Sequence, residues 1–153
     1  MRVIFLDFDG VLNSEKYLRA SKAVGVIIDP SRMNLLKEIV NKTEAKIVLS
    51  TSWREHWEKQ PDKCDNIGAS INDIFSEYVL DIYDKTPKLS TGRVEEIKNW
   101  LLMHPDTETF LVLDDMLLCD DVLDGHFVKT SNYFNGLDES DVKRSIDILL
   151  GEI

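Results

Sequence analysis

Short aliphatic runs alternate with amphipathic helical patterns along this chain, and this alternation limits the fold more than any other feature. We interpret each run as a strand that is covered on both faces. The predicted strands are residues 3–6, 45–49, 110–113 and 126–129. The predicted helices begin near residues 30, 71, 92 and 138. This order predicts a parallel sheet between two layers of helices, which is a three-layer α/β/α, Rossmann-like fold.

One domain, residues 1–153, is expected from a chain of this length. Two inserts, residues 14–28 and 53–90, interrupt the alternation of strands and helices. Neither insert is long enough for an independent cap domain, so we expect a minimal cap, although the second insert could form a small flap. Within this second insert, residues 81–90 are expected to form a loop or a short edge strand.

The net charge narrows the range of partners. Twenty-eight acidic and 18 basic side chains give a formal charge of −10. Such a charge repels a nucleic-acid backbone at long range. Broad, sequence-independent binding to nucleic acid is therefore not expected, although a local basic cleft stays open as an alternative.

Several further features predict a cytoplasmic protein. The apolar runs are far shorter than the roughly 18–20 residues that a membrane span needs, so no membrane partner is expected. Asp7 follows the start of the chain too closely for the apolar stretch of a signal peptide. Cys64 and Cys119 form no CxxC motif, and we interpret both as free thiols in a reducing compartment.

Three of the predicted strands end in polar residues. These clusters are Asp7-Phe8-Asp9-Gly10, Ser50-Thr51-Ser52 and Asp114-Asp115. Because parallel strands bring their carboxyl ends to one edge of the sheet, the clusters should converge there. Carboxylates gathered in this way repel one another, and a hard divalent cation such as Mg²⁺ resolves that conflict.

The first cluster carries the most information, because an Asp-x-Asp-Gly motif directly follows an aliphatic strand. Residues i and i+2 of a strand face the same way, so Asp7 and Asp9 would face one substrate. Gly10 permits a tight turn after the strand and lets the backbone approach a ligand closely. We therefore interpret this motif as the centre of a functional site.

These residues resemble the motifs of the haloacid dehalogenase-like (HAD) phosphohydrolase superfamily. The first motif matches DFDGV at residues 7–11, the second matches Ser50 after IVL, and the fourth matches LDD at residues 113–115. More narrowly, FLDFDGVLN, KIVLSTSWRE, GRVEEIKNWL, FLVLDD and FVKTSNYFNGL resemble the small, minimal-cap HAD domains associated with RNA-repair proteins. The resemblance spans nearly the whole chain.

The resemblance implies roles for the four aspartates. Asp7 would be the nucleophile and Asp9 the general acid and base. Mg²⁺ would be held by Asp7, by the backbone carbonyl of Asp9 and by Asp114. Asp115 would support these ligands or bind the ion through water.

The resemblance also implies a phosphate-binding set. Ser50 and Thr51 would bind phosphoryl oxygens together with a basic residue from the third motif of the superfamily. We assign that basic residue to Arg93, with Lys88 as the alternative. Arg93 lies near a predicted helix N-terminus, where its charge opposes the helix dipole and favours an anionic partner.

The function implied is that of a Mg²⁺-dependent phosphatase that hydrolyses phosphate monoesters through an aspartyl-phosphate intermediate. The expected substrate is a phosphorylated small molecule, a nucleotide or a nucleic-acid end, and the last of these follows from the resemblance alone. A small-metabolite phosphatase, closed over its ligand by residues 53–90, remains an alternative. So does a catalytically quiet, Mg²⁺-binding interaction module, although it would not require the second aspartate of the motif.

Two aromatic residues and an arginine follow the Ser-Thr-Ser cluster. We interpret Trp53 and Trp57 as packing residues rather than as a platform on which bases stack. Arg54 has two open interpretations, because it could contact substrate or lie on the surface.

Overall fold

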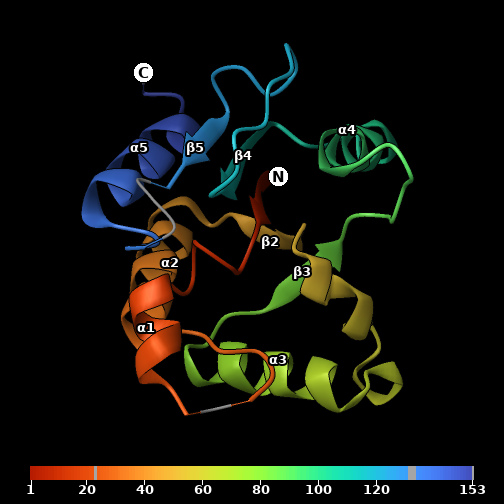
Figure 1. Ribbon diagram of the computed structural model, residues 1–153. Helices are drawn as coiled ribbons and strands as arrows, with labels where there is room; N and C mark the ends of the chain where they lie inside the picture. Colours follow the sequence, from red (N-terminus) through yellow and green to blue (C-terminus); the bar gives the residue numbers. More distant parts are fainter. Residues whose placement is uncertain (23, 131–133, 153) are drawn as a thin grey trace.

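A five-stranded, all-parallel sheet organises the computed structural model, which describes residues 1–22, 24–130 and 134–152 (Figure 1). The strand order is β3-β2-β1-β4-β5. The strands are β1 (Arg2–Leu6), β2 (Lys46–Leu49), β3 (Ile82–Lys85), β4 (Thr109–Asp114) and β5 (Phe127–Lys129). The α-helices are α1 (Glu15–Ala20), α2 (Pro30–Thr43), α3 (Asn66–Glu77), α4 (Arg93–Met103) and α5 (Glu139–Leu150). The predicted α/β fold with a parallel sheet is confirmed.

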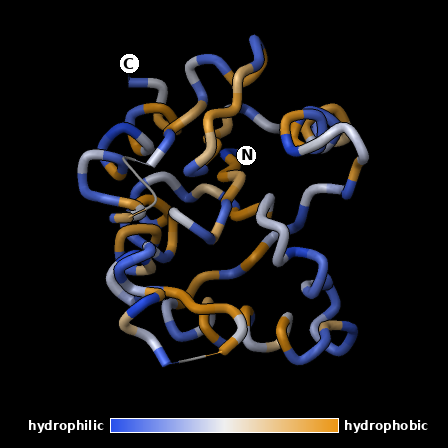
Figure 2. The backbone as a smooth tube through the Cα atoms, viewed as in Figure 1, coloured by the Kyte–Doolittle hydropathy of each residue, from blue (hydrophilic) through white to orange (hydrophobic). Residues whose placement is uncertain are grey.

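Helices cover both faces of the sheet, as the uninterrupted aliphatic strands predict. In β1, Ile4 and Leu6 belong to one hydrophobic cluster, which also contains buried residues of α2, α3 and α5. Val3 and Phe5 belong to a second cluster with buried residues of α4. Figure 1 shows α4 on the opposite side of the sheet from α2 and α5. In Figure 2 the central strands are drawn mostly in hydrophobic colours, as expected of strands buried on both faces.

Local signals in the sequence explain where the longer helices begin. Asp29 caps α2 by accepting a hydrogen bond from the backbone of Ser31 at 2.9 Å, and Pro30 occupies the first helical position. Asp138 and Asp141 form a reciprocal capping box at the start of α5. Both helices were predicted at these positions.

The structure extends α3 beyond the prediction, from residue 71 back to Asn66. Asp65 caps the helix by accepting from the backbone N–H of Gly68 at 2.9 Å. A Cβ atom on Gly68 would lie 2.0 Å from the carbonyl oxygen of His56. Glycine therefore permits close packing here, although its low helix propensity hid the first turn of the helix from sequence analysis.

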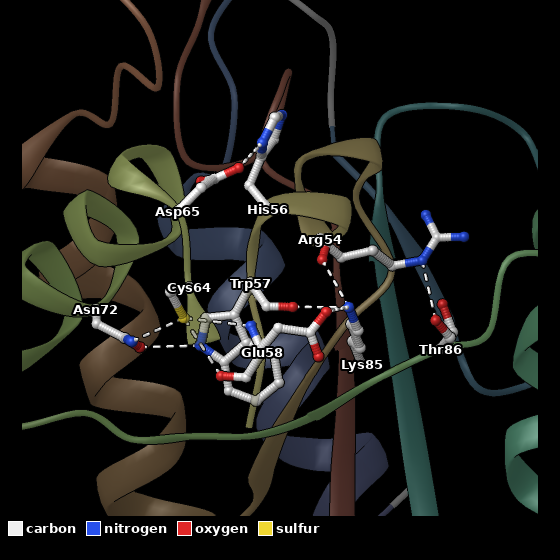
Figure 3. Close-up of polar contacts among 9 residues, drawn as sticks. All are labelled: Arg54, His56, Trp57, Glu58, Cys64, Asp65, Asn72, Lys85 and Thr86. Atoms are coloured by element: carbon white, nitrogen blue, oxygen red, sulfur yellow. Dashed lines mark hydrogen bonds and ion pairs between the residues drawn. The ribbon is translucent and has the colours of Figure 1, made fainter. Parts of the chain in front are cut away.

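Residues 53–90 form one edge of the sheet and the segment beside it. They contain most of the 3₁₀ helix η1 (Ser52–His56), the 3₁₀ helix η2 (Pro61–Lys63), α3 and the edge strand β3. Figure 3 shows Lys85, at the end of β3, donating to the carbonyl oxygens of Trp57 at 2.7 Å and Arg54 at 3.3 Å. These contacts connect the edge strand β3 to the segment that follows β2.

Two further observations concern membrane-spanning helices and the cysteines. Among the described residues, no helix combines the length and the apolar character needed to cross a membrane. Cys64 and Cys119 are both free, and Cys119 is exposed.

Candidate active site

The polar residues predicted to converge lie at the carboxyl ends of three adjacent strands. Strand β1 lies between β2 and β4, with Leu6 in register with both Leu49 and Leu113. Asp7, Ser50 and Asp114 follow these three residues directly. The backbone N–H of Asp7 donates to the carbonyl of Leu113 at 3.1 Å, and that of Ser50 donates to the carbonyl of Leu6 at 3.0 Å. The register of the sheet therefore sets the relative positions of the three side chains.

Three carboxylates gather at this edge. Oxygens of Asp7, Asp114 and Asp115 all lie within 4.8 Å of one another. Asp7 and Asp114 are buried, and Asp115 is half-buried. Burial and the charge of Asp114 raise the pKa of Asp7 to about 7, against the opposing effect of Arg93. Burial and Asp114 also raise the pKa of Asp115.

One guanidinium group contacts this carboxylate cluster. Arg93 is the first residue of α4, and its Nη1 lies 2.6 Å from Oδ2 of Asp114 and 3.3 Å from Oδ2 of Asp7. Burial opposes the positive charge of Arg93, but Asp7 and Asp114 outweigh that effect and raise its pKa. The cation at the helix N-terminus thus has the anionic partners that its position favours.

Asp9 has different partners from the carboxylate cluster. Its Oδ1 accepts a hydrogen bond from Nδ2 of Asn13 at 2.9 Å. Its Oδ2 accepts from the indole Nε1 of Trp53 at 3.1 Å. Sequence analysis identified neither donor as a site residue. Trp53 lies 44 positions from Asp9, so this contact depends on the tertiary fold.

The chain matches the family model described as "HAD domain in Swiss Army Knife RNA repair proteins" over residues 3–142. The chain belongs to this family. The matched range contains all the site residues described above, and membership places the domain in the HAD superfamily of hydrolases and phosphatases. No curated protein and no solved structure matches the chain.

The residues of this HAD domain fit the divalent cation that its superfamily implies. Among the described residues, three carboxylates face a single guanidinium, so the cluster carries an excess of negative charge when the carboxylates are ionised. Oxygen ligands of this kind suit Mg²⁺. The Ser50 hydroxyl is buried and has no hydrogen-bond partner among the described residues, so it is a donor that a ligand can use.

Gly10 keeps space open beside the carboxylates. Its φ is +81°, and a Cβ atom there would lie 2.4 Å from Oδ2 of Asp115. The backbone conformation and this close approach both require glycine. The turn after β1 can therefore pass directly beside Asp115 in the HAD domain.

The remaining predicted phosphate-binding residues occupy different surroundings. Thr51 is buried, and its hydroxyl accepts from the backbone N–H of Trp53 at 3.4 Å as the cap of η1. Lys88 is exposed, and its Nζ pairs with Glu55 at 2.6 Å. Of the two basic residues considered, Arg93 is the one that the structure places against the aspartates.

Arg54 lies in a buried network, so the interpretation that places it on the surface is wrong. Its Nη2 lies 2.7 Å from Oε2 of Glu96, and both side chains are buried. Its other nitrogens donate to the carbonyls of Thr51 at 3.0 Å and Thr86 at 3.1 Å (Figure 3 shows the contact with Thr86). Glu96 is one turn after Arg93 in α4. The pair therefore connects the end of β2 to the helix that carries Arg93.

Proposed function

We propose that this HAD domain is a Mg²⁺-dependent phosphatase that hydrolyses phosphate monoesters through an aspartyl-phosphate on Asp7. The observation that carries the proposal is the cluster at the carboxyl edge of the sheet, where Asp7 lies beside Asp114, Asp115 and Arg93. Family membership supports the phosphatase class. Asp9, two residues after Asp7, supplies a second carboxylate with separate hydrogen-bond partners.

Asp7 and Asp9 divide the chemistry between them. A carboxylate oxygen of Asp7 attacks phosphorus while the bond from phosphorus to the leaving oxygen breaks. The Asp9 carboxyl gives its proton to that oxygen, so the product leaves as an alcohol. Asp9 then takes a proton from the water that attacks the aspartyl-phosphate. The bond between phosphorus and Asp7 breaks, which releases inorganic phosphate and restores both carboxyl groups.

The other residues at this edge of the sheet would bind the metal ion and the phosphate. Asp7 and Asp114, with Asp115 beside them, would hold Mg²⁺. The bound cation supplies charge neutralisation for the phosphate. The Ser50 hydroxyl, which has no hydrogen-bond partner among the described residues, and the Arg93 guanidinium would bind phosphoryl oxygens, where negative charge is distributed in the transition state.

We propose a nucleotide or a polynucleotide end as the substrate class. The support comes from the description of the family, which names RNA repair proteins. A small phosphorylated metabolite is the second candidate, and the net charge of −10 favours it because that charge repels a polyanion.

The test is phosphate release from a panel that contains p-nitrophenyl phosphate, nucleotides, phosphorylated metabolites and oligonucleotides with a 3′- or 5′-phosphate. We expect turnover with Mg²⁺, loss of turnover with EDTA, and a fall of about 10²–10⁴ in kcat for Asp9→Asn. The preferred substrate assigns the class. No turnover on any member of the panel with Mg²⁺ would contradict the enzyme and favour a binding module.

A further inference from the structure

The Asp9 carboxylate is held on both sides by N–H donors from separate parts of the chain. Asn13 belongs to the segment after β1, and its Nδ2 donates to Oδ1 at 2.9 Å. Trp53 belongs to η1, and its indole Nε1 donates to Oδ2 at 3.1 Å. Each carboxylate oxygen therefore has its own donor, and rotation of the carboxyl group would break both hydrogen bonds.

The orientation of the Asn13 amide is fixed by its other partners. Its Nδ2 also donates to the carbonyl of Ile27 at 2.9 Å, and its Oδ1 accepts from the backbone N–H of Gly10 at 3.0 Å. If the amide were reversed, its oxygen would face the acceptor oxygens of Asp9 and Ile27. Its NH₂ group would then face the backbone N–H of Gly10, so all three hydrogen bonds would be lost. Asn13 is also buried, with 1% of its surface exposed. It therefore presents an N–H to Asp9 in a single orientation.

Trp53 is held from two directions as well. Its backbone N–H donates to the hydroxyl of Thr51, the cap of η1, at 3.4 Å. Its half-buried ring packs against the hydrophobic cluster that contains α2, α3 and α5. The indole has a donor and no acceptor, so it fixes one oxygen of Asp9 and leaves the remaining lone pairs of the carboxyl group for proton transfer.

We propose that Trp53 is a positioning residue for Asp9: its indole N–H, together with the amide of Asn13, fixes the carboxyl group so that its proton reaches the leaving oxygen. The inference rests on the proposed function, in which Asp9 is the general acid. Proton transfer requires the donor and the leaving oxygen to be within hydrogen-bond reach. A carboxyl group free to rotate would spend less time in that position.

The kinetic test compares two substrates of similar shape that differ in their need for a proton. The leaving group of p-nitrophenyl phosphate departs without much protonation, whereas that of phenyl phosphate depends more on the acid. In Trp53→Phe, which keeps an aromatic ring and removes the N–H, we compare kcat/KM, because this constant reports the first phosphoryl transfer, in which the two leaving groups differ. We expect kcat/KM to fall about tenfold for phenyl phosphate and about twofold for p-nitrophenyl phosphate.

Trp57→Phe is the matched control, because this substitution also removes an indole N–H and keeps an aromatic ring. Its indole N–H donates to Oδ1 of Asn72 at 2.9 Å, away from Asp9 (Figure 3). This variant should leave the ratio of the two kcat/KM values unchanged. An equal fall in kcat/KM for both substrates in Trp53→Phe would overturn the inference and leave the proposed function in place. If the wild-type protein hydrolyses no member of the substrate panel, the proposed function fails and the inference that rests on it fails as well.

A second readout requires no activity. The chain has three tryptophans, whose indole N–H signals can be followed by NMR in metal-free protein. The signal that Trp53→Phe removes should shift upfield in Asp9→Asn, because the charge of its acceptor is lost. The signals of Trp57 and Trp100 should stay in place, since Trp100 donates to Asp84 at 2.9 Å. An unmoved Trp53 signal would show that the indole does not bind Asp9 and would overturn the inference.

Discussion

At the scale of single residues, burial and a neighbouring carboxylate shift the pKa of Asp7. Its pKa in the folded chain is about 7, raised from 3.8 by burial and by Asp114. A folded-state pKa above the unfolded value adds stability that is fully present below the unfolded pKa. That stability is lost as the pH rises from about 4 through about 7. In the absence of a cation, the ionised carboxylate therefore opposes folding.

Replacement of Asp7 should remove this pH dependence. In EDTA at pH 8, we expect Asp7→Asn to be more stable than the wild-type protein by up to about 4 kcal/mol in the free energy of unfolding. The difference should shrink steadily toward pH 4, because the wild-type carboxyl is then protonated. Urea titrations across this pH range measure it. A variant that is less stable than the wild type at pH 8 would contradict the inference that burial and Asp114 disfavour the ionised Asp7 carboxylate.

The two basic residues considered for phosphate binding have different partners. Arg93 contacts Asp7 and Asp114, whereas Lys88 is exposed and pairs with Glu55. We expect Arg93→Ala to lower kcat about 10²–10³-fold, as loss of a charge-stabilising donor does. Lys88→Ala should change kcat less than about twofold, since exposed ion pairs contribute little. Steady-state kinetics of the two variants with p-nitrophenyl phosphate decide between them, and the reverse order would move the basic residue to position 88.

At the scale of elements, a buried ion pair connects α4 to the end of β2. Arg54 and Glu96 lie 2.7 Å apart, and Glu96 also accepts from the backbone N–H of Leu89 at 2.9 Å. Removal of one partner leaves the other charge buried without compensation. The same change would loosen the start of α4, from which Arg93 reaches the aspartates.

Glu96→Gln tests this dependence, with Glu95→Gln as its matched control on the same helix. We expect Glu96→Gln to lower the free energy of unfolding by about 3–5 kcal/mol. Glu95 is half-exposed and pairs with Lys98 at 3.5 Å. Its replacement should cost less than about 1 kcal/mol. Denaturant titrations compare the two variants, and equal losses of stability would show that the Arg54–Glu96 pair does not hold the helix.

The elements also differ in how far the sequence predicts them. Strands β1, β2 and β4 are uninterrupted aliphatic runs that end in polar residues, so their positions and the meeting of Asp7, Ser50 and Asp114 follow from local pattern. Strand β3 has two apolar residues followed by two charged ones at the sheet edge, and all four of its residues are only half-buried. Such a segment has the composition of a loop as much as of a strand.

Trp53 and Asn13 were missed for a related reason. Their part in the site depends on which tertiary partner each side chain meets, and residue type alone does not specify that partner. The indole of Trp53 is compatible with core packing, with a hydrogen bond or with a stacked base. The fold selects among these by placing η1 against the turn after β1, where Asp9 accepts its N–H.

At the scale of the whole molecule, the excess of ten negative charges and the local site have opposite effects on the binding of a nucleic-acid substrate. A terminal phosphate would meet Arg93 and a bound cation, but the rest of a polyanion would approach a surface of like charge. Long-range repulsion weakens as salt is added, because its range falls to about 10 Å at 0.1 M. A protein that binds nucleic acid through a basic surface shows the reverse, a steep loss of affinity with salt.

The salt dependence of kcat/KM therefore separates the two modes of recognition. For an oligonucleotide of about 20 residues with a terminal phosphate, we expect kcat/KM to stay level or rise as KCl is increased from about 50 to about 200 mM. A mononucleotide is the matched control and should respond less, because it carries fewer phosphates into the repulsive field. A fall of about 10³-fold over this range would instead show several phosphate contacts with lysines and arginines. The substrate strand would then follow a local basic cleft that overrides the net charge.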